Sequence, residues 1–240
     1  MRIALIADIH ANGFALNAVL NHAKEQEVNV ILFSGDLVGY YYQPKEVLDL
    51  LDEWPWFGVK GNHDDLLGAS DDYCNSLVPK YGSGILLARE QLSQKNKSRI
   101  LSLPEKLDIQ IDGLNFTICH GTTWDPNTYL YPDADKNMQQ KMLMHAPSAD
   151  VILFGHTHYP TNWQGLKRNP SQTVSILNPG SVGQVRDREP GACYAIFDTV
   201  TRKALFYRIS YDLKPLLDMC ENLDPSVPFL AEVLTRNEKS

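Results

Sequence analysis

Polar side chains of the kinds that bind metals follow five short apolar runs, and this pattern constrains the fold more than any other feature. Each run has the length and the continuous apolar character of a buried parallel strand. The polar groups that end the runs are Asp8-Ile9-His10, Gly35-Asp36, Gly61-Asn62-His63-Asp64, His120-Gly121 and Gly155-His156-Thr157-His158. Open α/β sheets bind ligands in the crevice beyond the carboxyl ends of their strands. The pattern therefore predicts that five distant fragments meet at one sheet edge.

The size and charge fit a globular protein with a small substrate. A chain of 240 residues buries roughly 70 to 75% of its extended surface, and no repeat or linker divides it, so we expect a single domain over residues 1–240. The 29 acidic and 22 basic residues give a formal charge of -7, which argues against stable nucleic-acid binding. Bound cations can still reverse the local charge of a carboxylate-rich site and allow a phosphorylated substrate.

Cysteine spacing and hydropathy suggest where the protein resides. The sequence contains no Cys-x-x-Cys pair, which favours buried free thiols over a zinc ribbon or a disulfide framework for Cys74, Cys119, Cys193 and Cys220. No apolar run reaches the roughly 18 to 20 residues that span a bilayer, and the first run lacks a signal-peptide pattern. We expect a cytoplasmic protein with no membrane partner. The oligomeric state does not follow from the sequence.

Alternating strand and helix patterns predict two packed, mixed β-sheets with helices outside. Strands are expected at 2–7, 28–33 and 56–60, with intervening helices capped by Asn12 and begun by Pro44. Asp112-Gly113 suits the type I′ turn of a hairpin. Residues 65–103 read as a largely helical insertion over the cleft. The other expected strands are 107–111, 115–119, 151–154, 174–177, 193–198 and 204–209, and the other expected helices are 80–91, 93–103, 135–145 and 213–236.

Each motif alone also has a purely structural explanation. Asp8 and His10 could be a carboxylate cap and a packed imidazole, and a lone His120 would more often be a core side chain. However, five of the seven histidines lie in these motifs, and each of the five follows an apolar run of strand length. Five unrelated core histidines at such similar positions are a poor explanation of the pattern. His22 and His145 fall in helical patterns outside the series, where a solvated or packed side chain is the better interpretation.

The ordered motifs D-x-H, G-D, G-N-H-D, H-G and G-H-T-H resemble the calcineurin-like metallophosphoesterase family. Asn178-Pro179-Gly180-Ser181-Val182-Gly183 resembles a further element of its small prokaryotic phosphodiesterases. The resemblance implies a four-layer α/β/β/α sandwich. It also implies a catalytic proton donor, His63, and two metals that share Asp36, with Asp8, His10 and His158 on one and Asn62, His120 and His156 on the other.

The ligand types limit the choice of metal ion, and one departure from the family pattern limits the class of substrate. Mixed oxygen and imidazole ligands favour Mn, Fe, Zn, Co or Ni over Mg²⁺ and Ca²⁺, and we expect two divalent or trivalent ions, with Mn or Fe first. The phosphoprotein phosphatase branch continues Gly-Asp with an Asp-Arg pair, whereas Leu37 and Val38 follow Asp36 here. We therefore discount a protein Ser/Thr phosphatase. Asp64 is a candidate to orient His63, with a surface turn contact as the alternative.

The expected reaction is hydrolysis of a phosphodiester or of a small phosphomonoester. Two cations would activate a bridging water as the attacking hydroxide, and His63 would protonate the departing oxygen. The substrate-binding candidates are Asn12, Arg186 and Arg188, with solvated loop charges as the alternative for the arginines. A nucleotide or a dinucleoside polyphosphate is a candidate substrate because aromatic residues follow two motifs, although loop packing also explains them: Tyr40, Tyr41, Tyr42, Trp124, Tyr129 and Tyr131.

Two other classes of protein compete with this interpretation. A non-catalytic metal-binding scaffold protein could keep the same fold and ions without turnover, although the complete ligand set and His63 count against it. A metallo-β-lactamase-like hydrolase would carry an H-x-H-x-D-H run, which the sequence lacks.

Overall fold

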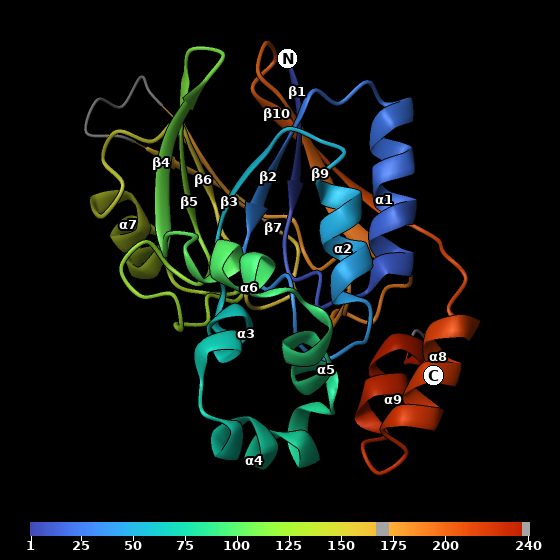
Figure 1. Cartoon of the computed structure of the whole chain (residues 1–240). Coiled ribbons are helices and arrows are strands. Elements are labelled where there is room, and N and C mark those ends of the chain that lie inside the picture. Colours follow the sequence, from blue (N-terminus) through green and yellow to red (C-terminus); the bar gives the residue numbers. More distant parts are fainter. Residues whose placement is uncertain (167–172, 237–240) are drawn as a thin grey trace.

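Two five-stranded sheets pack face to face in the computed structural model, which describes residues 1–166 and 173–236. The strand order is β10-β9-β1-β2-β3 in one sheet and β4-β5-β6-β8-β7 in the other. Helices cover the outer face of each sheet, with α1 and α2 on one side and α7 on the other (Figure 1). The expected four-layer α/β/β/α sandwich of two mixed sheets is therefore confirmed.

The first sheet contains three parallel strands, β1 (Arg2–Ile6), β2 (Val30–Ser34) and β3 (Trp56–Val59). Two antiparallel strands, β9 (Ala192–Asp198) and β10 (Lys203–Ile209), extend it beyond β1. The crossovers between the parallel strands are helices α1 (Gly13–Glu25) and α2 (Pro44–Leu51). These elements agree with the strands and helices predicted for the first 60 residues.

The second sheet begins with the predicted hairpin of β4 (Lys106–Ile111) and β5 (Leu114–Cys119). Asp112 (φ 49°) and Gly113 (φ 77°) both take the left-handed conformation that a type I′ turn requires. Strands β6 (Val151–Leu153) and β8 (Thr173–Asn178) continue the sheet in parallel with β5, and β7 (Thr161–Leu166) pairs antiparallel with β8. Strand β7 was not predicted from the sequence, because this edge strand contains polar residues and a glycine in place of a continuous apolar run.

Helices fill the long connection between β3 and β4, and they differ in part from the prediction. They are α3 (Asn62–Asp65), the 3₁₀ turn η1 (Leu66–Gly68), α4 (Asp71–Tyr81), α5 (Gly84–Gln91) and α6 (Gln94–Leu101). The single helix predicted over 80–91 is wrong at its start, because Gly82 adopts a φ of 77° and ends α4 there. The Gly61 motif, predicted as a turn, opens α3 instead.

The remaining helices are α7 (Lys136–Met144), α8 (Lys214–Leu223) and α9 (Phe229–Thr235). The α8 and α9 pair packs against the buried rings of Tyr41 and Tyr42, beside the helical connection (Figure 1). Within the described residues, no helix combines the length and the apolar character needed to cross a membrane.

Alternation along the strands separates the cores of the sandwich. In β1, Ile3 and Leu5 face the space between the sheets, whereas Ala4 and Ile6 face the helices. The inter-sheet core also contains Phe116 of β5 and Phe197 of β9, whose rings meet edge to face. This arrangement follows from the two-residue period of a strand, since both faces of a central strand must be covered.

Backbone hydrogen bonds tie the strand ends of the two sheets together. The amide of Asp8 donates to the Gly35 carbonyl at 3.0 Å within the first sheet, and the Gly155 amide donates to the His120 carbonyl at 2.7 Å within the second. The amide of His156 then donates to the Asp8 carboxylate at 3.1 Å and joins one sheet to the other. These hydrogen bonds therefore bring four of the five motifs together at one edge of the sandwich.

Truncating a ring between the sheets tests this packing. Phe116 is 1% exposed and meets the Phe197 ring edge-on at a centroid distance of 5.6 Å. We expect Phe116→Ala to lower the free energy of unfolding by about 3 to 5 kcal/mol in denaturant titrations. Phe57→Ala removes a ring that is 44% exposed and should cost less than about half as much. Equal losses in the two variants would contradict the inter-sheet core.

Candidate metal centre

Four histidines at the strand ends each direct one ring nitrogen at a backbone carbonyl. The nitrogen–oxygen distances are 3.2 Å for His10 Nδ1 to Val38, 2.8 Å for His120 Nδ1 to Ser34, 3.2 Å for His156 Nε2 to Asn127 and 2.5 Å for His158 Nδ1 to Gln184. A carbonyl oxygen only accepts, so each of these nitrogens carries a proton. In the neutral form of each ring, the second nitrogen is then a lone-pair donor, which is how outer partners orient metal-binding histidines.

The lone-pair nitrogens face one another across short distances. His10 Nε2 lies 3.1 Å from His158 Nε2, and His120 Nε2 lies 3.0 Å from His156 Nδ1. The side-chain oxygen of Asn62 is also 3.1 Å from His120 Nε2. Facing lone pairs repel unless a proton or a cation lies among them. A donor set of imidazoles, carboxylates and an amide oxygen therefore fits transition-metal ions.

The carboxylate of Asp36 connects the two groups of donors. Its Oδ2 lies 3.3 Å from His120 Nε2 and 3.7 Å from His10 Nε2. On one side, Asp8 Oδ1 lies 3.7 Å from His158 Nε2. The donor atoms of Asp8, His10 and His158 lie within 4.8 Å of one another, and so do those of Asp36, His120 and His156. The structure thus brings all seven expected ligands into two adjoining groups.

Burial and charge set the protonation of these groups in opposite directions. Burial lowers the pKa of His10 and His158 well below the usual value, and burial followed by His120 lowers that of His156 to about 4. Burial also acts to lower the pKa of His120, but Asp36, Asp8 and the Ser34 carbonyl together outweigh it and raise the value to about 10. Three of the four rings are therefore neutral, as ligation requires.

Ligand residues occupy strained backbone conformations. Left-handed φ values occur at Asp8 (54°), His10 (50°), Asp36 (63°), His156 (68°) and His158 (63°). Such values are uncommon outside glycine and cluster at functional sites, where the surrounding structure enforces them. The repeated strain at these positions indicates that the backbone is shaped to direct the ligand side chains inward.

Two glycines allow the ligand loops to approach closely. A Cβ atom on Gly61 would lie 2.1 Å from Asp36 Oδ1, and one on Gly35, whose φ is 95°, would lie 2.6 Å from His120 Nδ1. Neither contact can be relieved by rotating a flexible side chain. The glycines that precede Asp36 and Asn62 are therefore required by the geometry of the ligands.

Asp64 fixes the loop that carries Asp36. Its buried carboxylate accepts the amide hydrogens of Asp36 (2.9 Å), Leu37 (2.8 Å), Val38 (3.1 Å) and Gly61 (2.9 Å). Burial raises the pKa of this carboxyl to about 7. Both expectations for Asp64 are wrong, because its oxygens are bonded to backbone amides rather than to the His63 ring, and the residue lies in the interior rather than on a surface turn.

His63 lies beside the donor groups in an aromatic pocket. Its ring centroid is 4.9 Å from that of His10, 4.6 Å from that of Tyr40 and 5.4 Å from that of Tyr81. Its amide donates to Asp36 Oδ1 at 2.8 Å. A Cβ on Gly39 would meet His63 Nδ1 at 2.4 Å, so the Nδ1 edge packs against the chain. The opposite ring nitrogen, Nε2, is therefore the one placed to reach a substrate.

The three predicted substrate-binding residues lie in different surroundings. Arg186 is partly buried, and its Nη2 donates to the Tyr40 hydroxyl and to Gln184 Oε1, each at 2.9 Å. Arg188 is exposed, with a φ of 65°. Asn12 does not face the donors: its buried side chain accepts from the Ala15 amide and donates to the Gly183 carbonyl. We assign Asn12 a structural role because helix capping occupies its side chain.

The element at Asn178–Gly183 supports the first ligand loop. The Asn178 side chain donates to the Gly155 carbonyl at 2.9 Å, and Ser181 Oγ donates to the Asp8 carbonyl at 2.7 Å. The amide of Gly183 also donates to the Asp8 carbonyl, at 3.0 Å. This segment therefore holds the backbone of Asp8 against the loop that carries His156.

The aromatic residues predicted near the site divide into two groups. Tyr40 and Tyr129 contact the donors, since Tyr129 stacks on the His156 ring at 3.9 Å. Tyr41 and Tyr42 are instead buried beneath the C-terminal helices. Trp124 packs against His145, and the ammonium of Lys141 on α7 lies over its ring. The contacts of Tyr41, Tyr42 and Trp124 therefore agree with the alternative explanation, in which these rings pack within the protein and do not bind substrate.

Two features of the site were not predicted from the sequence. They are Tyr81, which contacts His63, and the backbone carbonyls that orient the histidines. Tyr81 ends a helix in the connection between β3 and β4, where no motif marked it. A backbone carbonyl is common to every residue, so no sequence signal could identify those of Ser34, Val38, Asn127 and Gln184. Their role depends on the fold.

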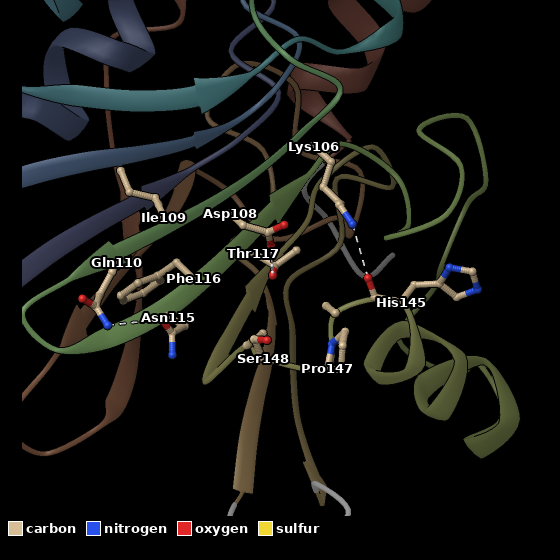
Figure 2. A pocket seen from close by; sticks show the side chains of 12 residues that line it. Lys106, Asp108, Ile109, Gln110, Asn115, Phe116, Thr117, His145, Pro147 and Ser148 are labelled. Carbon is tan, nitrogen blue, oxygen red and sulfur yellow. Dashed lines mark hydrogen bonds between the residues drawn. The ribbon is translucent and has the colours of Figure 1, made fainter.

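A separate hollow of about 410 Å³ lies between the β4–β5 hairpin and the end of α7 (Figure 2). Within it, Thr117 Oγ1 donates to Asp108 at 2.5 Å and Lys106 Nζ donates to the His145 carbonyl at 3.3 Å. None of the expected metal ligands lines this hollow. We therefore assign it no part in the metal centre.

Known proteins share both the sequence pattern and the fold. A family model described as "Calcineurin-like phosphoesterase superfamily domain" matches residues 1–202. The uncharacterized protein MJ0912 of Methanocaldococcus jannaschii is 34% identical over 226 residues, which cover 88% of each chain. A metallophosphoesterase from Sphaerobacter thermophilus has a TM-score of 0.78 at 28% identity, with 99% of each chain covered.

A further solved structure, the hypothetical protein PH1004 from Pyrococcus horikoshii OT3, has a TM-score of 0.84 at 22% identity. The match covers 100% of this chain and 99% of that one, and it shows a common fold. The family model and the relative that is 34% identical extend the similarity to the sequence itself. The protein therefore belongs to the calcineurin-like phosphoesterase superfamily and is a hydrolase of phosphoric esters.

Proposed function

We propose that this protein hydrolyses small phosphodiesters, or small phosphomonoesters, with two transition-metal ions. The observation that carries the proposal is the position of Asp36 Oδ2 between His120 Nε2 and His10 Nε2, at 3.3 and 3.7 Å. One carboxylate placed between two donor groups suits a pair of cations about 3.5 to 4 Å apart. We assign Asp8, His10 and His158 to one ion, Asn62, His120 and His156 to the other, and Asp36 to both.

The donor types favour Mn or Fe, with Zn, Co and Ni as the alternatives. Four imidazoles, two at each ion, together with carboxylate and amide oxygens form a set that is too rich in nitrogen for Mg²⁺ or Ca²⁺. When bound, the ions would supply an activated water and polarise the phosphoryl oxygens. The chain holds its ligands ready for them, because backbone carbonyls fix the four ring orientations.

His63 is the proposed proton donor to the departing oxygen. Its Nδ1 edge packs against Gly39, which leaves Nε2 free to deliver a proton, and the Tyr40 and Tyr81 rings hold the imidazole in place. Donation by a positioned side chain is worth on the order of 10² to 10⁴ in rate. The aromatic contacts replace the carboxylate that orients the corresponding histidine in the phosphoprotein phosphatase branch.

Arg186 is the proposed phosphate contact. Its Nε and Nη2 groups are held by Gln184 and Tyr40, while Nη1 donates to no other residue in the described part of the chain. Because the Tyr40 hydroxyl accepts from Arg186, its own hydrogen is available to a substrate oxygen. This pair supplies positive charge and a donor where the Asp-Arg pair of the phosphatases is missing. Arg188 stays a weaker candidate because it is exposed.

The proposed setting is the reducing cytoplasm. All four cysteines are free and buried, as small apolar side chains, and burial raises the pKa of Cys119 and Cys193 to about 12. Inert thiols of this kind suit an intracellular protein.

Loss of the shared carboxylate should remove metal from both positions. We expect Asp36→Asn to retain less than about half of the metal of the wild type after dialysis, because the neutral amide is a weaker ligand at both ions. Elemental analysis of the folded protein measures the content directly. Asp133→Asn, an exposed loop change, serves as the matched control. Metal content in Asp36→Asn equal to that of the control would contradict the shared ligand.

Removing the proton donor should separate binding from turnover. We expect His63→Ala to keep its metal and lose about 10² to 10⁴ in kcat on phosphodiesters assayed with Mn²⁺. His145→Ala, at an exposed position, should retain wild-type kcat. Full turnover in His63→Ala would contradict the assignment. A fully metal-loaded wild-type protein that hydrolyses no activated phosphoester would instead favour the non-catalytic scaffold.

A further inference from the structure

Two side chains from distant parts of the chain lie near the candidate metal centre. Lys80 comes from the last turn of α4, and Tyr129 comes from the loop that follows His120. Tyr129 stacks directly on His156, whereas Lys80 is linked to His63 through the Tyr81 ring. Neither residue belongs to a metal-binding motif. Their placement calls for an explanation beyond ligation.

Tyr129 forms an exposed aromatic shelf against a proposed metal ligand. Its ring stacks on the His156 ring at a centroid distance of 3.9 Å and an interplanar angle of 24°. The neighbouring ring of Tyr131 is parallel to it within 8°, at 5.9 Å. Tyr129 and Tyr131 nevertheless stay 49% and 44% exposed. Large apolar rings that are ordered but open to solvent beside a catalytic centre suit a planar group of the substrate.

The loop that presents this shelf is internally braced. Asp125 accepts from the Asn127 amide at 2.9 Å and from Thr128 Oγ1 at 2.6 Å, and its carbonyl accepts from the Thr122 amide at 2.9 Å. The Asn127 carbonyl in the same loop lies 3.2 Å from His156 Nε2. The shelf is therefore held in a fixed relation to the metal ligand, which reduces the entropy that ordering would cost on binding.

Lys80 places a positive charge on the His63 side of the site. Its ammonium lies 4.6 Å from the centre of the Tyr81 ring, and that ring is 5.4 Å from the His63 ring. The pKa of Lys80 is raised, chiefly by Tyr81 and further by Tyr129, so the side chain is charged at neutral pH. In a protein with a formal charge of -7, a cation separated from the proposed proton donor by one aromatic ring is placed to meet an anionic leaving group.

We propose that Lys80 and Tyr129 select the leaving group, which carries both a planar aromatic ring and an additional anionic group, as a nucleoside phosphate does. The inference rests on the proposed function, because His63 marks the side from which the leaving group departs. The ring stacks on Tyr129, and the anionic group pairs with Lys80. A substrate whose leaving group has only the ring contacts Tyr129 alone, and one whose leaving group has only the additional charge contacts Lys80 alone.

Three probes separate the two features. Diadenosine tetraphosphate carries rings and extra phosphates, bis(p-nitrophenyl) phosphate carries rings without extra charge, and inorganic tripolyphosphate carries charge without rings. We expect Lys80→Gln to lower the kcat/KM ratio of the first probe over the second about fivefold, the scale of one exposed charge pair. We expect Tyr129→Leu to lower the ratio of the first probe over the third about tenfold, the scale of one base–aromatic stack.

Matched controls and a second readout complete the test. Lys95→Gln and Phe229→Leu change an exposed lysine and an exposed aromatic ring elsewhere, and they should leave both ratios unchanged. ADP binding to the metal-free protein, measured by calorimetry, should weaken about fivefold in Lys80→Gln and about tenfold in Tyr129→Leu. Hydrolysis of all probes with ratios that neither variant alters would overturn this inference alone. No hydrolysis of any probe by the metal-loaded wild type would overturn the proposed function and this inference with it.

Discussion

The buried carboxylate of Asp36 is the constraint on which the rest of the site depends. Its Oδ2 faces donors from both sheets, and its Oδ1 accepts the amide of His63. A charge in this position must be held in a fixed place, and Asp64 achieves this by accepting four backbone amides, three of them from Asp36 itself and the two residues after it. The sequence Gly61-Asn62-His63-Asp64 therefore has two roles: it carries a proposed metal ligand and the proposed proton donor, and its last residue fixes the loop of Asp36, the proposed bridging ligand.

The fold supplies strain that the ligands require. Five of the proposed ligands sit at left-handed φ values, and the loops that carry them are held by hydrogen bonds from neighbouring strand ends, such as the Ser181 hydroxyl to the Asp8 carbonyl. Such conformations cost of order 1 to 3 kcal/mol each, and bound cations would offset part of that cost by satisfying the facing lone pairs.

The layers, and the meeting of the candidate ligands at one sheet edge, could be predicted from the sequence because both depend on local patterns. Apolar runs of strand length predict buried strands, and polar residues at their ends predict a common edge, as Asp8 and His120 illustrate. The sequence was insufficient wherever a role depends on distant neighbours. Asp64 could not be distinguished from a turn residue until the amides of the Asp36 loop were seen beside it. Edge strand β7 lacks an apolar run, and Lys80 and Tyr81 carry no motif at all.

The central claim is that two cations share Asp36. Crystals of the protein grown with Mn²⁺ and measured at wavelengths around the manganese absorption edge test it most directly, since anomalous difference maps locate each ion without assumptions about activity. The account predicts two peaks about 3.5 to 4 Å apart with the Asp36 carboxylate between them. A single peak at saturating Mn²⁺, or two peaks of which only one lies within bonding distance of Asp36, would contradict it.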